Sequence, residues 1–159
     1  IAKGRAAEET LMALKAAGIS HALVTAGGDL AIGNPPPGKA GWEVRLRTSA
    51  DAEGEELRLV LHDCGVSTSG DLHQFVEIEG KRYAHIIDPK TGLGLTSGVA
   101  CSVIAPDTTT SDAWATALCI LGSDRGLPLI KDLAGVHARG GESKEGVENV
   151  RPSPNFPSD

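Results

Sequence analysis

Two stretches of the chain alternate between apolar and polar residues, and this period of two strongly limits the structure they can form. Residues 42–47 place Trp42, Val44 and Leu46 between charged side chains, and residues 57–62 largely repeat the alternation. In an extended strand, every second side chain lies on the same face. Both stretches therefore predict β-strands with one buried and one exposed face.

Short apolar runs bounded by glycine, proline or asparagine predict further strands. They cover residues 21–26, 30–32, 75–78, 82–87 and 99–105. The runs at 75–78 and 82–87 flank Glu79-Gly80-Lys81, which predicts a β-hairpin. Residues 64–70 are small, and we expect this segment to bend.

Helical spacing appears in three places. Residues 5–17 are rich in Ala, Glu, Leu and Lys, and Gly18 stands where a helix C-cap belongs. A second helix is predicted from residue 111 to 121, after a threonine-rich loop. A third is predicted over 124–133, although Pro128 weakens it.

Length and composition predict one domain over residues 1–140. A chain of 159 residues with 40% hydrophobic composition is long enough to bury a core but too short for two typical domains. After Gly140 the sequence turns to Pro, Ser, Asn and Glu with almost no apolar spacing. We therefore expect residues 141–159 to form a disordered tail.

The charge balance excludes a nucleic-acid footprint. The formal net charge is −6, the pI is about 5.3, and no lysine or arginine cluster is present. A phosphate-bearing ligand must then be met locally, by a metal, a helix N-terminus or a single lysine. Cys64, Cys101 and Cys119 lie in apolar contexts without metal-ligand spacing, so we expect buried, reduced thiols.

Asp112 and Thr116 are candidate magnesium ligands. Their spacing of four residues on a predicted helix places both side-chain oxygens on one face, about one turn apart. Mg²⁺ prefers such hard oxygen donors and keeps several waters. The structural alternative is an aspartate that complements the helix dipole and a threonine that bonds back to the preceding turn.

His85 is the candidate general base, and Asp88 the residue that orients it. A neutral imidazole can take a proton from a hydroxyl nucleophile near physiological pH. The alternative is a histidine packed on a strand, followed by an ordinary turn at Asp88-Pro89. The residues alone leave both interpretations open.

Weaker signals come from glycine-rich and hydroxyl-rich turns. Gly27 and Gly28 can bring backbone N–H groups close to a ligand, with Asp29 bonding to it. Lys3 is a possible phosphate contact, and Ser69 offers a hydroxyl in the segment expected to bend. A plain turn, a solvated lysine and an ordinary bend are the respective alternatives.

Five motifs together raise the value of these signals. They are Ile1–Gly4, Ala26–Leu30, Ser67–Asp71, Gly80–Gly92 and Ser111–Leu118. In this order they closely resemble the ApbE-type flavin transferases, once called thiamine-biosynthesis lipoproteins. The resemblance extends from Ile1 to about Gly140, and the motif around His85 is its most specific part.

The resemblance implies an α/β (α+β-like) fold, an antiparallel-rich sheet with packed helices. It also implies FAD:protein FMN transfer, in which the FAD pyrophosphate is split, FMN is joined to a Thr or Ser of an acceptor protein, and AMP is released. Asp112 and Thr116 would bind Mg²⁺ together with a backbone carbonyl beside Ile1–Gly4. His85 would be the base, and Lys3, Asp29 and Asp88 would line or support the FAD pocket.

Acceptors of this family carry a flavinylation motif of the form Asp-Gly-x-(Ser/Thr)-Gly-Ala-Thr. Two other functions are compatible with the same motifs: a Mg²⁺-dependent FAD pyrophosphatase and a flavin-binding module without catalysis. The chain matches the C-terminal portion of the family, so we expect it to be incomplete. By resemblance the localisation is periplasmic, or a bacterial lipoprotein held by an N-terminal anchor outside this chain.

Overall fold

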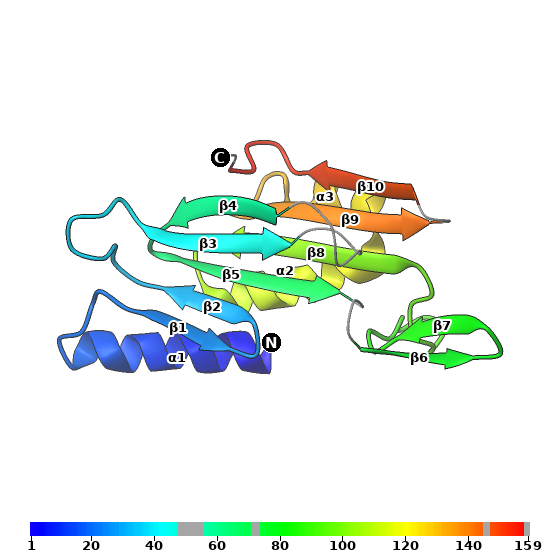
Figure 1. Cartoon of the computed structure of the whole chain (residues 1–159), viewed down its shortest axis with the longest axis horizontal. Helices are drawn as coiled ribbons and strands as arrows, with labels where there is room; N and C mark the ends of the chain where they lie inside the picture. Colours follow the sequence, from blue (N-terminus) through cyan, green and yellow to red (C-terminus); the bar gives the residue numbers. More distant parts are fainter. Residues whose placement is uncertain (48–55, 71–73, 145–146, 158–159) are drawn as a thin grey trace.

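The centre of the molecule is a six-stranded antiparallel sheet (Figure 1). The computed structural model describes residues 1–47, 56–70, 74–144 and 147–157. The strands, in their order across the sheet, are β1 (Leu23–Ala26), β2 (Asp29–Ile32), β5 (Cys64–Gly70), β8 (Gly98–Ala105), β9 (His137–Lys144) and β10 (Val147–Pro152). Every pairing is antiparallel, which confirms the expected type of sheet.

Helices cover one face of this sheet, and a hairpin covers the other (Figure 1). The helices are α1 (Ala2–Ala16), α2 (Thr108–Leu121) and α3 (Ser123–Ile130). The covering hairpin pairs β3 (Trp42–Arg47) with β4 (Glu56–Leu61). A second hairpin, β6 (Phe75–Ile78) and β7 (Lys81–Ala84), projects from one end of the sheet (Figure 1).

The apolar side chains fill both gaps between these layers. The core beneath the helices contains Ile86, Val99, Cys101, Val103, Ala105, Ala115, Leu118, Cys119, Ile130, Val136 and Ala138. The core beneath the β3–β4 hairpin contains Ile32, Val44, Leu46, Leu57, Leu59, Val66 and Ile104. Strand β8 contributes to both, so its residues from Val99 to Ala105 are buried without alternation. The predicted alternation in β3 and β4 is confirmed, because only one face of this hairpin meets the core.

Residues 64–70 form the straight strand β5, so the expected bend is wrong. Their small size serves close packing instead. A Cβ atom on Gly65 would lie 2.4 Å from backbone atoms of Thr108, at the start of α2. The small residues of β5 therefore allow α2 to approach the sheet.

Helix α2 begins three residues earlier than predicted, within the threonine-rich segment. Asp107 is its N-cap and accepts a hydrogen bond from the Thr110 N–H at 2.7 Å. Glu8 of α1 accepts a second bond, from the Thr109 N–H at 3.3 Å. These two acidic side chains satisfy amide groups that a helix start leaves without partners.

The remaining boundaries shift by a few residues. Helix α1 begins at Ala2 rather than residue 5, and Gly18 follows it with a φ of +84°. Helix α3 ends at Ile130 rather than residue 133. Within the described part of the chain, no helix is long and apolar enough to cross a membrane.

The predicted disordered tail from residue 141 to 159 disagrees with the structure over most of its length. Residues 141–144 belong to β9, and 147–152 form β10, which pairs with β9. Strand β10 lies at the edge of the sheet, where Asn149 and Arg151 are exposed. An edge strand is held by backbone hydrogen bonds and can be polar, so it shows little apolar spacing.

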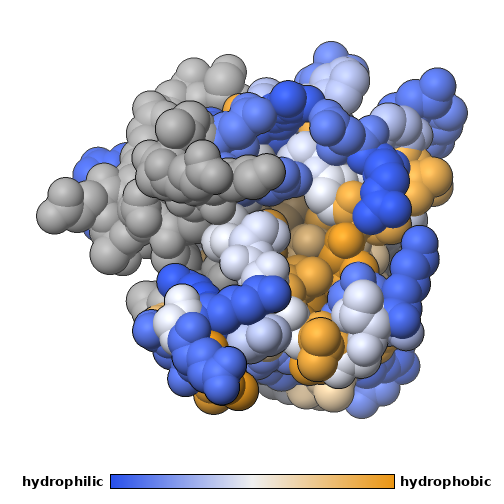
Figure 2. Space-filling view, turned by 90° about the vertical axis from the view of Figure 1, so that its right-hand side faces the viewer, coloured by the Kyte–Doolittle hydropathy of each residue, from blue (hydrophilic) through white to orange (hydrophobic). Residues whose placement is uncertain are grey.

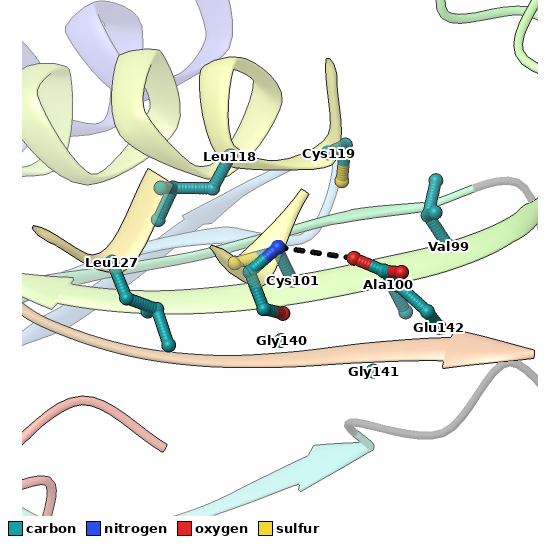
Figure 3. Close-up of a pocket in the computed structure, with 10 residues that line it drawn as sticks. Val99, Ala100, Cys101, Leu118, Cys119, Leu127, Gly140, Gly141 and Glu142 are labelled. Carbon is teal, nitrogen blue, oxygen red and sulfur yellow. Dashed lines mark hydrogen bonds between the residues drawn. The ribbon is translucent and has the colours of Figure 1, made fainter. Parts of the chain in front are cut away.

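All three cysteines are free thiols; Cys101 and Cys119 are buried as expected, whereas Cys64 is only partly buried. Cys101 and Cys119 line a cavity of about 10 Å³ between α2, β8 and β9 (Figure 3). This space holds at most one water molecule. Burial raises the pKa of Cys101 to about 12, and burial together with Asp63 raises the pKa of Cys64 to about 11. These thiols have structural rather than reactive surroundings.

Candidate functional site

Asp112 lies where the first turn of α1 packs against α2. Its Oδ2 accepts a hydrogen bond from the Gly4 N–H at 2.9 Å, and the amino group of Ile1 lies 2.9 Å from the same oxygen. The two helices touch closely, since a Cβ on Gly4 would lie 2.5 Å from the Thr108 carbonyl oxygen and 2.7 Å from the Asp112 Cβ. The Asp112 residue is 5% exposed. The carboxylate is therefore fixed in position before any ligand binds.

Lys3 and Asp29 form a second charged pair beside Asp112. The Lys3 Nζ lies 3.6 Å from the Asp29 Oδ2 and donates a hydrogen bond to the Gly27 carbonyl at 3.2 Å. Gly27 and Gly28 form the turn between β1 and β2, with φ values of +57° and +97°. A Cβ on Gly27 would lie 2.7 Å from the Lys3 Cδ, so glycine is required for the lysine to cross this turn.

The two carboxylates differ in their electrostatic surroundings. Burial and the nearby charge of Asp112 raise the pKa of Asp29 above its ordinary value, against opposing effects of Ser67 and Lys3. Burial also acts to raise the pKa of Asp112. The hydrogen bond from the Gly4 N–H and the charge of Lys3 act in the opposite direction.

Hydroxyl groups connect β5 to α2 beside these acids. The Ser67 and Ser111 Oγ atoms lie 2.9 Å apart, and the Ser69 Oγ lies 3.0 Å from the Thr116 Oγ1. Thr116 thus faces the sheet, one turn along α2 from Asp112. Asp112 itself lies beyond the first turn of α2, because the helix begins at Thr108. The first-turn explanation for this aspartate is therefore wrong.

The residues present fit a Mg²⁺ ion in their chemistry. Asp112 offers a fixed carboxylate, and Thr116 offers a hydroxyl from the same helix. The Asp29 Oδ2 beside Asp112 is buried without a hydrogen-bond donor, and the Lys3 Nζ lies 3.6 Å from it. Within the described ranges, no three His, Cys, Asp or Glu side chains form a metal-binding group. The magnesium assignment therefore remains a prediction.

His85 lies at the base of the β6–β7 hairpin, directly after β7. Its side chain is exposed, and its Nδ1 lies 3.2 Å from the Gln74 carbonyl oxygen. A carbonyl can only accept a hydrogen bond, so Nδ1 must carry the proton. In the neutral ring this leaves the lone pair on Nε2, which faces away from that bond. The structure thus selects the tautomer that a general base requires.

Asp88 forms a turn in the loop after His85. Its Oδ1 accepts a hydrogen bond from the Lys90 N–H at 2.8 Å, and its carbonyl accepts one from the Gly92 N–H at 2.8 Å. These bonds match the turn alternative considered for this segment. A role of Asp88 in orienting His85 or supporting FAD stays a prediction.

The fold thus divides the predicted site residues into two groups. Lys3, Gly27, Asp29 and Asp112 meet at the start of α1, and Ser69 meets Thr116 on the same face of the sheet. His85 and Asp88 belong to the projecting hairpin and the loop that follows it. Gly28 shapes the β1–β2 turn, with open space beside it.

Sequence reasoning missed three groups at this site. The Gly4 N–H donates to Asp112, and Ser67 lies beside Asp29. The Ser111 hydroxyl pairs with that of Ser67 across the α2–β5 contact. All three lie within the conspicuous motifs, but their contacts join segments far apart in the sequence. In the sequence, Gly4 and Ser111 stand next to the predicted site residues Lys3 and Asp112, which was the available signal.

Known proteins resemble this chain in both sequence and fold. An FAD:protein FMN transferase of Treponema pallidum is 36% identical over 149 residues, covering 87% of this chain and 41% of the relative. One from Klebsiella pneumoniae is 34% identical over 135 residues, covering 83% and 38% respectively. The chain therefore spans about two fifths of the length of the curated relatives it matches.

A solved structure of a similar protein supports the same family assignment. The apo form of the flavinyl transferase ApbE of Pseudomonas stutzeri superposes with a TM-score of 0.81 at 28% identity, covering 97% of this chain and 48% of that one. The model of the ApbE family matches residues 1–139. The chain belongs to the ApbE family.

Proposed function

We propose that this chain forms part of an enzyme that transfers FMN from FAD to a hydroxyl group of an acceptor protein and releases AMP. The supporting observation is the cluster at the start of α1. It places a fixed Asp112 carboxylate, the Thr116 hydroxyl on the same helix, and the cation of Lys3 around one corner of the fold. Relatives named FAD:protein FMN transferase support the same function.

His85 acts as the base in the proposed reaction. Its Nε2 accepts the proton of an acceptor Ser or Thr hydroxyl while Nδ1 remains bonded to Gln74. The hydroxyl oxygen forms a bond to the phosphorus that carries riboflavin. The bond from that phosphorus to the bridging oxygen breaks, and AMP leaves with the bridging oxygen. The proton held by the imidazole is then released to solvent.

Asp112 and Thr116 would hold Mg²⁺, with Asp29 beside them. Bound Mg²⁺ would offset negative charge on the pyrophosphate and so stabilise its cleavage. Lys3 crosses the β1–β2 turn and presents a positive charge at the same corner. In a protein with a formal charge of −6, such local positive charge is needed to bind a pyrophosphate.

Hydrolysis of FAD to FMN and AMP is the second candidate function. The exposed position of His85 favours it, since water can reach the same imidazole that would serve a protein hydroxyl. The two reactions differ only in the nucleophile. An acceptor that occupies the approach to His85 would suppress hydrolysis.

The test is to incubate the enzyme, expressed from its full reading frame, with FAD, Mg²⁺ and a peptide containing the Asp-Gly-x-Thr-Gly-Ala-Thr pattern. Mass spectrometry should show FMN added to the peptide, and chromatography should show an equal amount of AMP. Two peptides, each with alanine in place of one of the two threonines, are the matched controls, and the one that lacks the acceptor hydroxyl should remain unmodified.

The outcomes separate the candidates. AMP release with free FMN and an unmodified threonine peptide would favour hydrolysis. FAD that remains intact while bound would indicate a module without catalysis. Either result would contradict the proposed transfer.

A further inference from the structure

We propose that the acceptor protein binds as an extended segment along the outer edge of β6, in the hairpin that carries His85. This inference rests on the proposed transferase function, because it names the surface that the protein substrate uses. It depends on three features of the hairpin: its free backbone groups, its exposed apolar face, and the direction in which the His85 ring leans.

The register of the hairpin shows which backbone groups of β6 are free. Its turn consists of Glu79 and Gly80, which makes Ile78 and Lys81 a hydrogen-bonded pair. Alternation along the ladder then makes Gln74 and His85 another such pair, and the His85 N–H does donate to the Gln74 carbonyl at 3.0 Å. The N–H and C=O groups of Phe75 and Glu77 must therefore point away from β7.

The two edges of the hairpin differ. On the β7 side, the Ala84 N–H donates to the Leu95 carbonyl at 2.8 Å, so that edge is already in use. On the β6 side, no strand of the described ranges pairs with Phe75 or Glu77. Proteins usually protect such an edge, because its free groups pair readily with another chain.

The face of the hairpin that carries His85 is exposed and mainly apolar, with the Lys81 ammonium 5.5 Å from the centre of the Tyr83 ring. Val76 and Ile78 are each 58% exposed, and Tyr83 lies directly opposite Val76. A hollow of about 330 Å³ is lined by Gln74, Phe75, Val76, Tyr83, Ala84 and His85. Figure 2 faces this end of the molecule and shows apolar surface among polar side chains. On the opposite face, the Phe75 ring is covered by the Arg82 guanidinium at 3.8 Å.

The His85 ring leans toward β6, because its Nδ1 bonds to the Gln74 carbonyl. Neighbouring strands lie about 4.8 Å apart, so a segment on the outer edge of β6 would run two strand spacings from β7. The lean of the ring shortens this gap. A segment that leaves the edge at Gln74 and crosses the open face brings its hydroxyl to Nε2.

The chemistry of this surface fits a polypeptide rather than FAD. Free amide and carbonyl groups in strand register recognise the backbone of an extended chain whatever its side chains, and the apolar face takes alternate side chains. FAD has no repeating backbone to match them. The occupant is therefore the extended segment of the acceptor that contains the modified Ser or Thr.

A proline at Glu77 tests the edge directly. Glu77→Pro removes an outward N–H and leaves the bonds between β6 and β7 intact, because that amide does not face β7. The Michaelis constant for the Asp-Gly-x-Thr-Gly-Ala-Thr peptide should rise about tenfold, with kcat at saturating peptide retained. Glu77→Gln keeps the amide and should keep the wild-type constant.

Amide hydrogen exchange gives a readout that does not depend on turnover. Adding the peptide to the wild-type enzyme should slow exchange at Phe75 and Glu77 and not along β10, the exposed edge of the main sheet. Unchanged exchange at both residues, or a Glu77→Pro variant with a normal peptide constant, would overturn the inference. A wild-type enzyme that never releases AMP from FAD would instead contradict the proposed function.

Discussion

The start of α1 and the β6–β7 hairpin differ in how deeply their residues are buried and how firmly they are held. At the start of α1, Asp112 and Asp29 are buried, bonded or ion-paired, and held by contacts between α1, α2, β2 and β5. In the hairpin, all four residues of β6 are exposed, and His85 is held mainly by Gln74. One region is fixed by the core, while the other projects from it.

The two regions suit two different tasks, phosphate binding and reception of a protein substrate. Binding charged phosphates requires groups whose positions and protonation do not change, because reorganising them would cost free energy at the moment of reaction. Receiving a protein substrate requires a surface that another chain can reach. In the proposed reaction, the core would supply charge stabilisation and the accessible hairpin would receive the acceptor.

Asp112→Asn is expected to have one of the two largest effects. The variant keeps the size of the side chain but loses its charge, so Mg²⁺ binding measured by calorimetry should be lost. FMN transfer should fall on the order of 10³-fold. Thr116→Val, which removes a neutral donor, should cost less. A wild-type metal titration in the Asp112 variant would show that the metal lies elsewhere.

His85→Ala should reduce FMN transfer by about 10² to 10⁴-fold, the usual contribution of a general base. Its melting temperature should match that of the parent, because the side chain is exposed and belongs to the hairpin. Affinity for FAD should also change little. Transfer at the parent rate would assign His85 a purely structural role.

Two glycine substitutions compare the regions in terms of stability. Gly65→Ala places a methyl group against the backbone at the start of α2 and should destabilise the fold by about 1–3 kcal/mol. Gly80→Ala meets no atom within 4 Å and bears only the strain of its φ of +73°, about 1 kcal/mol. Urea unfolding measures both. Equal costs would mean that the α2–β5 contact is looser than described.

The raised pKa of Asp29 predicts a pH-dependent effect of Asp29→Asn on the metal-free protein. Between the ordinary aspartate value of 3.8 and the raised pKa, the folded state holds more protons than the unfolded state. Stability therefore falls as pH rises through this window, and the full cost persists above it. The variant should melt at a higher temperature at pH 7, and its advantage should shrink as pH falls toward 4. A constant difference would contradict this.

The smallest effect concerns the thiols. With pKa values of about 12 for Cys101 and about 11 for Cys64, at most roughly one molecule in 1,000 carries a thiolate at pH 8. Iodoacetamide should leave both residues unmodified in the folded protein and alkylate them in urea. Rapid labelling of folded Cys101 would show that the core beneath α2 opens.

Local patterns predicted most of the elements but not their contacts. The strands around Val44 and Leu59 and the Glu79-Gly80 hairpin turn depend on short-range periodicity, which a sequence displays directly. The bend predicted from Cys64 to Gly70 is wrong, because the small size of these residues allows close packing against α2, about forty positions along the chain. The edge strand β10 was not predicted, because a strand held by backbone hydrogen bonds needs no characteristic amino-acid composition.

The candidate site likewise combines features that a local pattern predicts with contacts that only the fold creates. Asp112 and Thr116 are four residues apart, so their shared helix face was predictable. Their neighbours Gly4 and Ser69 come from other segments, and only the fold brings them near. The selected tautomer of His85 depends on one carbonyl of Gln74, eleven positions earlier, which no motif indicates.

The order of strands across the main sheet has a consequence for how the protein is made and varied. Strands β1, β2, β5, β8, β9 and β10 are neighbours in the same order as they occur along the chain. Each can join the growing edge as it leaves the ribosome, with nothing threaded between strands already paired. The two hairpins are excursions from this series. Lengthening such an excursion costs only about 0.6 kcal/mol per doubling. Relatives can therefore exchange the β6–β7 hairpin without rebuilding the sheet.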